Sequence, residues 1–395
     1  MILDRPLVRR NIGLNAHPAG LTAVVRQQVA AARARGPIPN GPTLALVLGC
    51  STGYGLASRV AAAFGSGAAT LGVSVERPGT PERSGTPGWY NNRAFEREAR
   101  EAGLTAMTLE QDAFQEETRD RAVDALRGLG RPVDLIVYSI VSPVRVDPAD
   151  GVEYRLVLKP VGKPYSGLTM DLMTGELLPC TLPPAEPDEI AAAVKVMGGE
   201  DWALWIRRLR AEGLLAPGCR TLAYSYIGPG FSRAIYRDGT IGRAKAHLEA
   251  TARALDRELR DSPLQGRAWV SVNKALITRA SAVLPGIALY MAALYRVMKD
   301  KGLHEGCWEQ MDRLLRDRLA PGRVVPVDAE ERIRLDDWEL RPDVQEEVAR
   351  RMEGVESADL ARRVDLAGVR HDFLEAHGFD VAGVDYAAEI DPAAG

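Results

Sequence analysis

The feature that most constrains the fold is a regular alternation of apolar, strand-like runs and charged helical segments in the first third of the chain. The first run, Thr43–Leu48, is continuously apolar, as expected of a parallel strand covered on both faces. Similar runs follow at 69–75, 104–109 and 133–138, with a spacing of roughly 30 residues, the size of one βαβ unit. The pattern predicts an α/β fold with a doubly wound parallel sheet flanked by helices.

The pattern changes after the fourth run. Residues 144–187 are rich in Pro, Gly and Thr and contain short alternating pieces, which predicts an inserted hairpin or small sheet. A further strand is expected at 221–224, and residues 328–395 have the charged, amphipathic pattern of a helical C-terminal extension packed on the domain. We therefore expect one extended domain over residues 1–395.

Composition excludes several classes of function. The chain has 46% hydrophobic and 26% charged residues, and its net charge of -3 comes from interspersed signs, so neither nucleic acid nor an anionic membrane is an expected partner. It contains neither a bilayer-length apolar stretch nor a signal-peptide core. Its four cysteines form no CxxC or CxxH pair, which argues against a metal site and against disulfides. We expect a soluble, cytoplasmic protein without a metal.

A glycine loop, Gly49–Gly55, joins the first apolar run to a helical segment. Glycines allow a tight turn and let backbone N–H groups approach a pyrophosphate, and a helix N-terminus adds a positive dipole end. Ser51 and Thr52 add hydroxyl donors. The G-x3-G-x-G spacing resembles that of short-chain dehydrogenases, which favours a bound dinucleotide. A strand-to-helix turn without a ligand is the alternative.

Polar residues also follow the next strands. Glu76 comes 21 residues after Gly55, where an acid can accept hydrogen bonds from the adenosine ribose and disfavour a 2′-phosphate, so NADH is expected rather than NADPH. Arg77 could instead attract that phosphate, and Glu76 could be a solvated loop acid. Asp112 is placed to meet the adenine amino group, and residues 139–142 are placed beside the nicotinamide ribose.

Two tyrosines and a lysine lie in the stretch Thr221–Leu248. Tyr236 and Lys245 are nine residues apart, so at about 100° per residue they would lie on opposite faces of a single helix. They can meet only if the backbone between them is not one helix. The turn at 238–240 is expected to supply this break, and Thr240 can cap the helix that follows. Tyr236 would then lie in the loop before the helix and Lys245 in its second turn.

These groups suit one chemistry. Hydride addition to an α,β-unsaturated thioester leaves an enolate, which a phenol can stabilise or protonate. A lysine ammonium can hold the cofactor and lower the pKa of the phenol. Alternatively, Tyr236 packs with its hydroxyl satisfied and Lys245 is a solvated helix residue.

Long stretches of the chain match one family. They are AYSYIGP (223–229), IYRDGTIGRAK (235–245), LGCSTGYGLASR (48–59), VMGGEDWALWI (196–206), MKDKGLHEGCWEQ (298–310) and RLDDWELRPDVQ (334–345). Over nearly its whole length the chain resembles the FabV-type enoyl-ACP reductases and the trans-2-enoyl-CoA reductases. The resemblance implies a monomeric Rossmann-type domain with a small substrate-cover region. It also implies NADH-dependent reduction of the 2,3-trans double bond of enoyl thioesters, on acyl carrier protein or CoA, in fatty acid synthesis.

The resemblance also implies residue roles. Tyr236 is similar to the family's catalytic proton donor or enolate stabiliser, Tyr226 to a substrate-contacting tyrosine, and Lys245 to a cofactor-binding lysine. The other implied cofactor contacts are Gly49, Cys50, Ser51, Thr52, Gly53, Tyr54, Val75, Glu76, Asp112, Ala113, Ile140, Val141, Leu276, Ile277 and Thr278. Two positions depart from the pattern. Val141 stands where a small residue is frequent, and Val75 where an aromatic residue is common.

Two other functions remain open. A short-chain 3-ketoacyl or alcohol dehydrogenase would need a Tyr-x3-Lys pair, and the chain has one at Tyr295 and Lys299, on an apolar helix where core packing is expected. A catalytically silent dinucleotide-binding protein would need to lack the phenol or the lysine, and both are present. The carrier, the acyl-chain length and the tyrosine that delivers the proton stay open.

Overall fold

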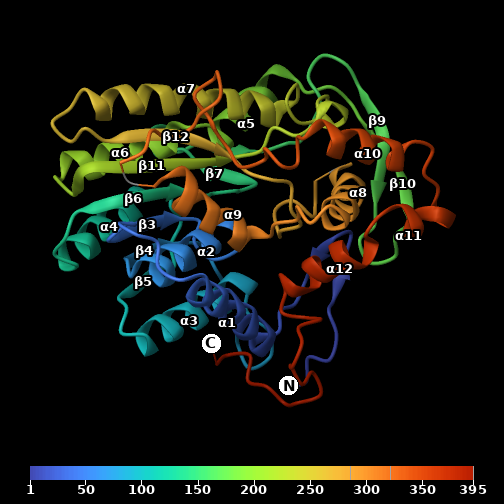
Figure 1. The fold of residues 1–395 in the computed structure, drawn as a ribbon, viewed down its shortest axis with the longest axis horizontal. Coiled ribbons are helices and arrows are strands. Elements are labelled where there is room, and N and C mark those ends of the chain that lie inside the picture. Colours follow the sequence, from blue (N-terminus) through green and yellow to red (C-terminus); the bar gives the residue numbers. More distant parts are fainter. Residues whose placement is uncertain (285, 321, 395) are drawn as a thin grey trace.

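The computed structural model describes residues 1–284, 286–320 and 322–394, and within them one large parallel sheet dominates the fold (Figure 1). Its seven strands lie in the order β13-β12-β11-β6-β3-β4-β5, and every neighbouring pair is parallel. The predicted doubly wound parallel sheet is confirmed. The strands are β3 (Leu44–Leu48), β4 (Ala69–Val73), β5 (Ala106–Leu109), β6 (Val133–Tyr138), β11 (Leu215–Ser225), β12 (Arg267–Val272) and β13 (Ile333–Arg334).

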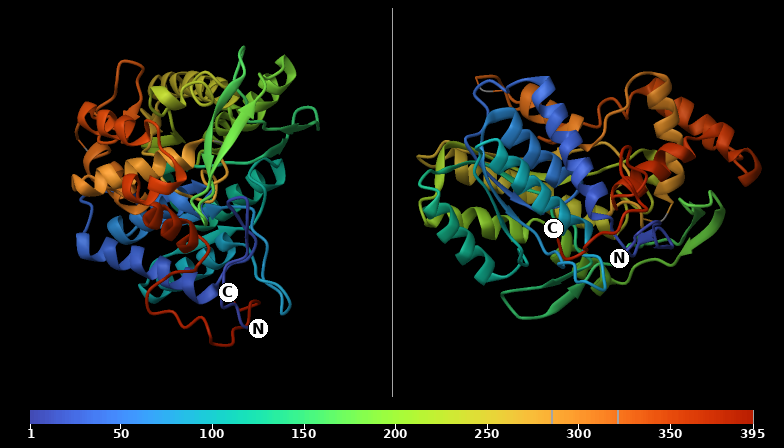
Figure 2. Two further views of the ribbon diagram at one scale, coloured as in Figure 1. Left: turned by 90° about the vertical axis from the view of Figure 1, so that its right-hand side faces the viewer. Right: turned by 90° about the horizontal axis from the view of Figure 1, so that it is seen from below.

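Helices cover both faces of the sheet (Figures 1 and 2). One face carries α1 (Pro18–Arg35), α2 (Gly53–Val60) with its π-helical continuation Ala61–Gly65, α3 (Pro87–Glu101) and α9 (Cys307–Arg313), which continues through Leu314–Arg318. The other face carries α4 (Glu116–Gly128), α5 (Pro187–Met197), α6 (Glu200–Ala211) and α7 (Thr240–Arg260).

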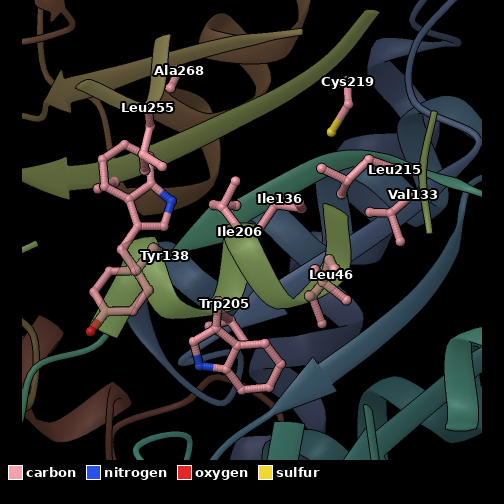
Figure 3. Close-up of a cluster of buried hydrophobic side chains, with 14 of the residues drawn as sticks. Leu46, Val133, Ile136, Tyr138, Trp205, Ile206, Leu215, Cys219, Leu255 and Ala268 are labelled. Atoms are coloured by element: carbon pink, nitrogen blue, oxygen red, sulfur yellow. The ribbon is translucent and has the colours of Figure 1, made fainter. Parts of the chain in front are cut away.

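The sheet has a hydrophobic core on each of its faces, and both cores follow from the alternation of side chains along each strand. In β3, Leu44, Leu46 and Leu48 join the cluster under α4, α6 and α7, whereas Ala45 and Val47 join the cluster under α2 and α9. Figure 3 shows the first cluster, in which Trp205 and Ile206 of α6 face the sheet. Because both faces are buried, the strand could be recognised as one continuous apolar run.

A third group of elements lies at the carboxyl end of the sheet. The buried helix α8 (Ile287–Asp300) packs against α10 (Pro342–Met352), α12 (Leu366–Glu375) and strand β9. Strand pairs add β1 (Val8–Arg9) with β2 (Ile12–Gly13), β7 (Val144–Val146) with β8 (Glu153–Arg155), and β9 (Tyr165–Met170) with β10 (Leu177–Leu182). The remaining short helices are Gly230–Ser232, Ser357–Asp359 and α11 (Leu360–Arg363). No helix of the described residues is long and apolar enough to cross a membrane.

Two local expectations differ from the structure. Strand β11 begins at Leu215 rather than at 221, and its pairing with β6 shifts register between Leu215 and Arg220, where Gly218 has a φ of +72°. The prediction that Thr240 caps α7 is wrong, because Gly239 occupies the N-cap. The Thr240 hydroxyl instead donates to the Val157 carbonyl at 2.6 Å.

Candidate active site

The order of the strands reverses at β3. The chain proceeds from β3 to β4 and β5 on one side, and from β6 to β11, β12 and β13 on the other. Ligands of doubly wound sheets bind at the carboxyl ends of the strands at such a switch point. Gly49 lies there with a φ of +82°, and a Cβ at this position would lie 2.3 Å from the Ser139 carbonyl oxygen. Only glycine lets the ends of β3 and β6 approach this closely.

The glycine loop leads directly into α2. Gly53, the first helical residue, has a φ of +53°, and the N-cap Thr52 makes no side-chain capping hydrogen bond. The first-turn N–H groups of α2 are therefore placed for an anion at the helix N-terminus. The Asn91 amide fixes the loop by donating to the Ser51 carbonyl at 2.9 Å. Cys50 points into the core, so its backbone rather than its side chain faces the crevice.

The acid after β4 lies beside this loop. Glu76 accepts a 2.6 Å hydrogen bond from the Ser51 hydroxyl, and the Arg279 guanidinium lies 3.6 Å from the same carboxylate oxygen. Val75, at the same edge, is 66% exposed. Arg77 donates to the Ser84 carbonyl at 3.3 Å, so its guanidinium is held by a neighbouring loop.

The expected contacts after β5 and β6 lie at the same edge of the sheet. Asp112 accepts the Phe114 N–H at 3.0 Å, and the Ala113 carbonyl accepts the Trp205 indole N–H at the same distance. Ile140 and Val141 follow β6, and Val141 is 60% exposed. An exposed apolar side chain here can contact a planar ring of a ligand.

A cavity of about 180 Å³ adjoins this edge. Tyr226 and Tyr236 meet in its wall, with ring centroids 5.0 Å apart in an edge-to-face arrangement. Lys245 also lines the cavity, and its amine donates to the Tyr224 carbonyl at 3.2 Å. The other expected residues along it are Tyr54, Ile140, Val141, Leu276 and Thr278.

The segment Leu276–Thr278 closes one side of this cavity. Its position is fixed because the Tyr295 hydroxyl accepts the Ile277 N–H at 3.0 Å. A larger cavity, about 470 Å³, lies behind the segment among α1, α9 and α12. Neither Tyr226, Tyr236 nor Lys245 borders the larger cavity, so the smaller one is where the expected catalytic groups meet.

Burial controls the protonation of these groups. It lowers the pKa of Lys245 to about 8, with Glu249 acting in the opposite direction. It also raises the pKa of the Tyr236 phenol. The expectation that Lys245 lowers the pKa of the phenol is therefore wrong, because desolvation of the phenolate dominates. Tyr236 stays protonated at neutral pH and can serve as an acid.

Unpartnered polar atoms in the same cavity indicate a polar ligand. Within the described ranges, the buried Ser225 hydroxyl and the Asn273 amide nitrogen have no hydrogen-bond partner, and both residues line the cavity. Buried polar groups are rarely left unpaired. Together with the glycine cradle at the helix N-terminus, these groups fit a nicotinamide dinucleotide laid along the carboxyl edge of the sheet.

Sequence reasoning missed two residues near this site. Arg279 follows the expected segment 276–278 directly, but nothing in the sequence placed it near Glu76. Glu339 lies inside a stretch quoted for the resemblance, RLDDWELRPDVQ, yet had no expected role. In the structure its carboxylate accepts a 3.1 Å hydrogen bond from the Tyr226 hydroxyl.

Comparison with known proteins decides the family. A family model described as the trans-2-enoyl-CoA reductase catalytic region matches residues 83–320, and one described as the NAD(P)H binding domain of trans-2-enoyl-CoA reductase matches residues 3–81. The chain belongs to the trans-2-enoyl-CoA reductase family. A trans-2-enoyl-CoA reductase [NADH] of Treponema denticola is 53% identical over 99% of both chains, and an enoyl-[acyl-carrier-protein] reductase [NADH] of Flavobacterium johnsoniae is 49% identical over 98% of this chain and 97% of that one.

Solved structures agree with this assignment. The crystal structure of the Treponema denticola trans-2-enoyl-CoA reductase in complex with NAD has a TM-score of 0.94 at 52% identity, covering 99% of this chain and 98% of that one. The Clostridium acetobutulicum trans-2-enoyl-CoA reductase in complex with NADH has a TM-score of 0.96 at 38% identity, with the same coverage. The expected family, reaction class and NAD cofactor are confirmed.

The short-chain dehydrogenase alternative finds no support. Tyr295 is fully buried, and its hydroxyl donates to Asp372 at 2.6 Å. Lys299 pairs with Asp365 at 2.7 Å. This Tyr-x3-Lys pair therefore packs and stabilises α8 and α12, and neither of its residues lines the cavity that holds Tyr236.

A third family model, described as an enoyl reductase FAD binding domain, matches residues 327–390. The residues there do not fit a flavin dinucleotide. In doubly wound folds a dinucleotide pyrophosphate lies on glycine N–H groups at the start of a helix that follows a strand. The one strand described in this segment, β13, leads instead to the buried carboxyl groups of Asp336 and Glu339. We assign no flavin chemistry to this segment.

Proposed function

We propose that this member of the trans-2-enoyl-CoA reductase family reduces the 2,3-trans double bond of enoyl thioesters with NADH, on CoA or on acyl carrier protein, in fatty acid synthesis. The observation that carries the proposal is the meeting of Tyr226, Tyr236 and Lys245 around one cavity at the switch point of the sheet. The names of the relatives support both carriers.

Each polar group has a role in the reaction. Bound NADH supplies the hydride to the β-carbon of the enoyl thioester. The Tyr226 hydroxyl hydrogen-bonds the thioester oxygen and stabilises the enolate as charge develops. Tyr236 gives its proton to the enolate, because no described residue hydrogen-bonds its hydroxyl whereas Tyr226 is engaged by Glu339. Lys245 holds the cofactor ribose or phosphate.

The cofactor lies along the edge of the sheet in this proposal. The pyrophosphate lies on the loop from Gly49 to Tyr54, the adenosine ribose at Val75 and Glu76, and the adenine at Asp112 and Ala113. The nicotinamide half lies between Ile140–Val141 and the segment Leu276–Thr278. The Glu76 carboxylate disfavours a 2′-phosphate and so selects NADH.

The organisation of the chain serves this site. We infer that the chain acts as one domain. Residues 144–187 form a cover over the site, and the C-terminal extension 328–395 packs on the domain. Residue 395 lies outside the described residues. Leu156 and Leu158 of the cover line the cavity, which supports a role in enclosing the acyl group. We further propose a monomeric, cytoplasmic enzyme, as the family resemblance and the composition of the sequence lead us to expect.

The decisive test follows NADH absorbance with crotonyl-CoA and with longer enoyl thioesters. We expect turnover by the wild type and a loss of roughly 10²–10⁴-fold in kcat for Tyr236→Phe, the usual contribution of a positioned proton donor. Tyr154→Phe is the matched control, because its hydroxyl bonds Asp150 outside the cavity. Absence of turnover on every substrate would refute the enzyme, and full activity in Tyr236→Phe would refute the proton donor.

A further inference from the structure

The carboxyl group of Glu339 lies directly behind the Tyr226 hydroxyl. Its Oε1 accepts hydrogen bonds from Tyr226 at 3.1 Å and from Tyr290 at 2.7 Å, and its Oε2 accepts the Ala275 N–H at 2.7 Å. Glu339 is fully buried. A buried carboxyl group needs such donors to offset its desolvation, and here one of the three is a residue of the reaction cavity, which links this acid to the site.

The fold explains how this acid reaches the site from the C-terminal extension. Strand β13 runs parallel to β12, so the residues after it continue over the same edge of the sheet as the glycine loop. The Leu335 and Asp336 N–H groups donate to the Val272 carbonyl, and the Gln345 amide donates to the Glu339 carbonyl at 2.7 Å. The backbone on both sides of Glu339 is therefore fixed.

The hydrogen-bond geometry gives this carboxyl group two distinct effects. When it is ionised it can only accept, so the proton of Tyr226 is directed at Glu339 and away from the cavity. When it is protonated it donates to the Tyr226 oxygen, and the Tyr226 hydroxyl is then free to donate to the thioester oxygen. No covalent bond of the substrate changes in either case. The hydrogen bond between Glu339 and Tyr226 reverses its direction, and the Tyr226 proton becomes available to the thioester oxygen.

We propose that Glu339 is a positioning residue for the reduction, whose protonation turns Tyr226 from a hydrogen-bond donor toward Glu339 into a donor toward the thioester oxygen. Glu339 can act in this way only if the protein carries out the proposed reduction. The C-terminal segment 327–390 then contributes an acid to the active site.

The surroundings of Glu339 place this switch near neutral pH. Burial raises the pKa of Glu339 to about 7, against the opposing effects of the Ala275 N–H, the Tyr290 hydroxyl and the Lys274 ammonium. The titratable or charged groups that face it are Tyr54 of α2, Tyr226 after β11, Lys274 after β12, Tyr290 of α8 and Asp336 after β13. Deprotonation of Glu339 as the pH rises therefore removes the state in which Tyr226 donates to the thioester oxygen. As a result, kcat/KM should fall on the alkaline side.

The test measures kcat/KM for crotonyl-CoA between pH 5.5 and 9 at saturating NADH. Because the cofactor is then bound at every pH, the effect of Lys245 on NADH binding does not contribute to the pH profile. We expect kcat/KM of the wild type to fall by up to tenfold per pH unit above the pKa of Glu339. Glu339→Gln is the informative variant, because its amide donates to the Tyr226 oxygen at every pH. It should lack this alkaline fall while keeping activity within about tenfold of the wild-type maximum.

Two further variants make the result unambiguous. Tyr290→Phe removes one donor to Oε1 of Glu339 and also the hydrogen bond between Tyr290 and Tyr226. The loss of the donor to the carboxylate should move the alkaline limb up by roughly 0.5–1 pH unit. Asp201→Asn is the matched control, because Asp201 is a buried carboxyl group whose pKa burial also raises to about 7, but it contacts Arg119 and Tyr138 away from the cavity. It should leave the limb in place.

The proposal is overturned if Glu339→Gln keeps the wild-type alkaline limb, or loses activity by the same factor at every pH. It is also overturned if Tyr290→Phe leaves the limb unmoved, or if Asp201→Asn removes it. Wild-type turnover of crotonyl-CoA establishes the proposed function independently, so failure of the Glu339 assignment is distinguishable from failure of the reduction itself.

Discussion

Replacement of Gly49 by alanine should disturb the crevice at the switch point of the sheet, because the added methyl group would meet the backbone of the neighbouring strand end. A non-glycine residue in the left-handed region costs roughly 1–2 kcal/mol, and the φ of Gly49 is +82°. The added Cβ would also lie 2.3 Å from the Ser139 carbonyl oxygen, which is backbone and cannot rotate away. Overpacking of this kind costs a further 1–3 kcal/mol, roughly. We therefore expect Gly49→Ala to lower the free energy of unfolding by about 2–5 kcal/mol.

The chain offers a matched control for this substitution. Gly67 has a φ of +72°, but a Cβ there would meet no atom within 4 Å. Gly67→Ala should therefore show only the backbone cost of roughly 1–2 kcal/mol. Urea unfolding of both variants measures the difference, provided that the slope with denaturant is unchanged.

The two variants should also differ in cofactor binding. Gly49→Ala pushes the ends of β3 and β6 apart at the switch point, so we expect the Kd for NADH to rise by about tenfold or more, since tenfold corresponds to only about 1.4 kcal/mol. Gly67→Ala should bind NADH as the wild type does. Equal unfolding free energies for the two variants, or an unchanged Kd in Gly49→Ala, would refute the steric reasoning at the crevice.

Two shorter predictions concern the cofactor. Glu76→Ala should raise kcat/KM with NADPH relative to NADH. The carboxylate that repels a 2′-phosphate is lost, and Arg279, 3.6 Å from that carboxylate, becomes free to pair with the phosphate. If the variant gains no activity with NADPH, Glu76 does not select the cofactor. The Kd for NADH, followed by fluorescence titration, should rise as the pH passes through about 8, the pKa to which burial lowers Lys245, because the amine loses its charge. Lys245→Met should bind NADH weakly and without this dependence, and a wild-type Kd that is constant from pH 6.5 to 9.5 would contradict the role of the ammonium.

The parts of the fold that the sequence predicts are those governed by short-range pattern. The run Thr43–Leu48 could be recognised because burial on both faces requires apolar residues at every position. The start of β11 could not, because Pro217 and Gly218 are typical of a turn. The strand accommodates them where its pairing with β6 shifts register, and only the partner strand determines that shift.

The residues of the candidate site also divide into those that short-range pattern predicts and those that only long-range contacts bring together. The Gly49 loop and Glu76 belong to one βαβ unit, so their spacing along the chain carries information about their spacing in the fold. Glu339 meets Tyr226 across 113 residues through the pairing of β13 with β12, and a two-residue strand has no recognisable sequence signal. Thr240 illustrates the same limit, since its hydroxyl bonds Val157 of the covering segment rather than its own helix.

The nine-residue spacing of Tyr236 and Lys245 depends on a glycine between them. Tyr236 lies in a turn, where its N–H donates to the Ser232 carbonyl at 2.9 Å, and α7 begins only at Thr240. The turn folds back onto the first turn of α7, and a Cβ at Gly242 would lie 2.4 Å from the Tyr236 carbonyl oxygen and 2.0 Å from that of Arg237. A side chain at 242 would therefore push the phenol away from the helix that carries Lys245. The break at 238–240 allows the two groups to meet, and the absence of a side chain at 242 brings them close enough to line one cavity.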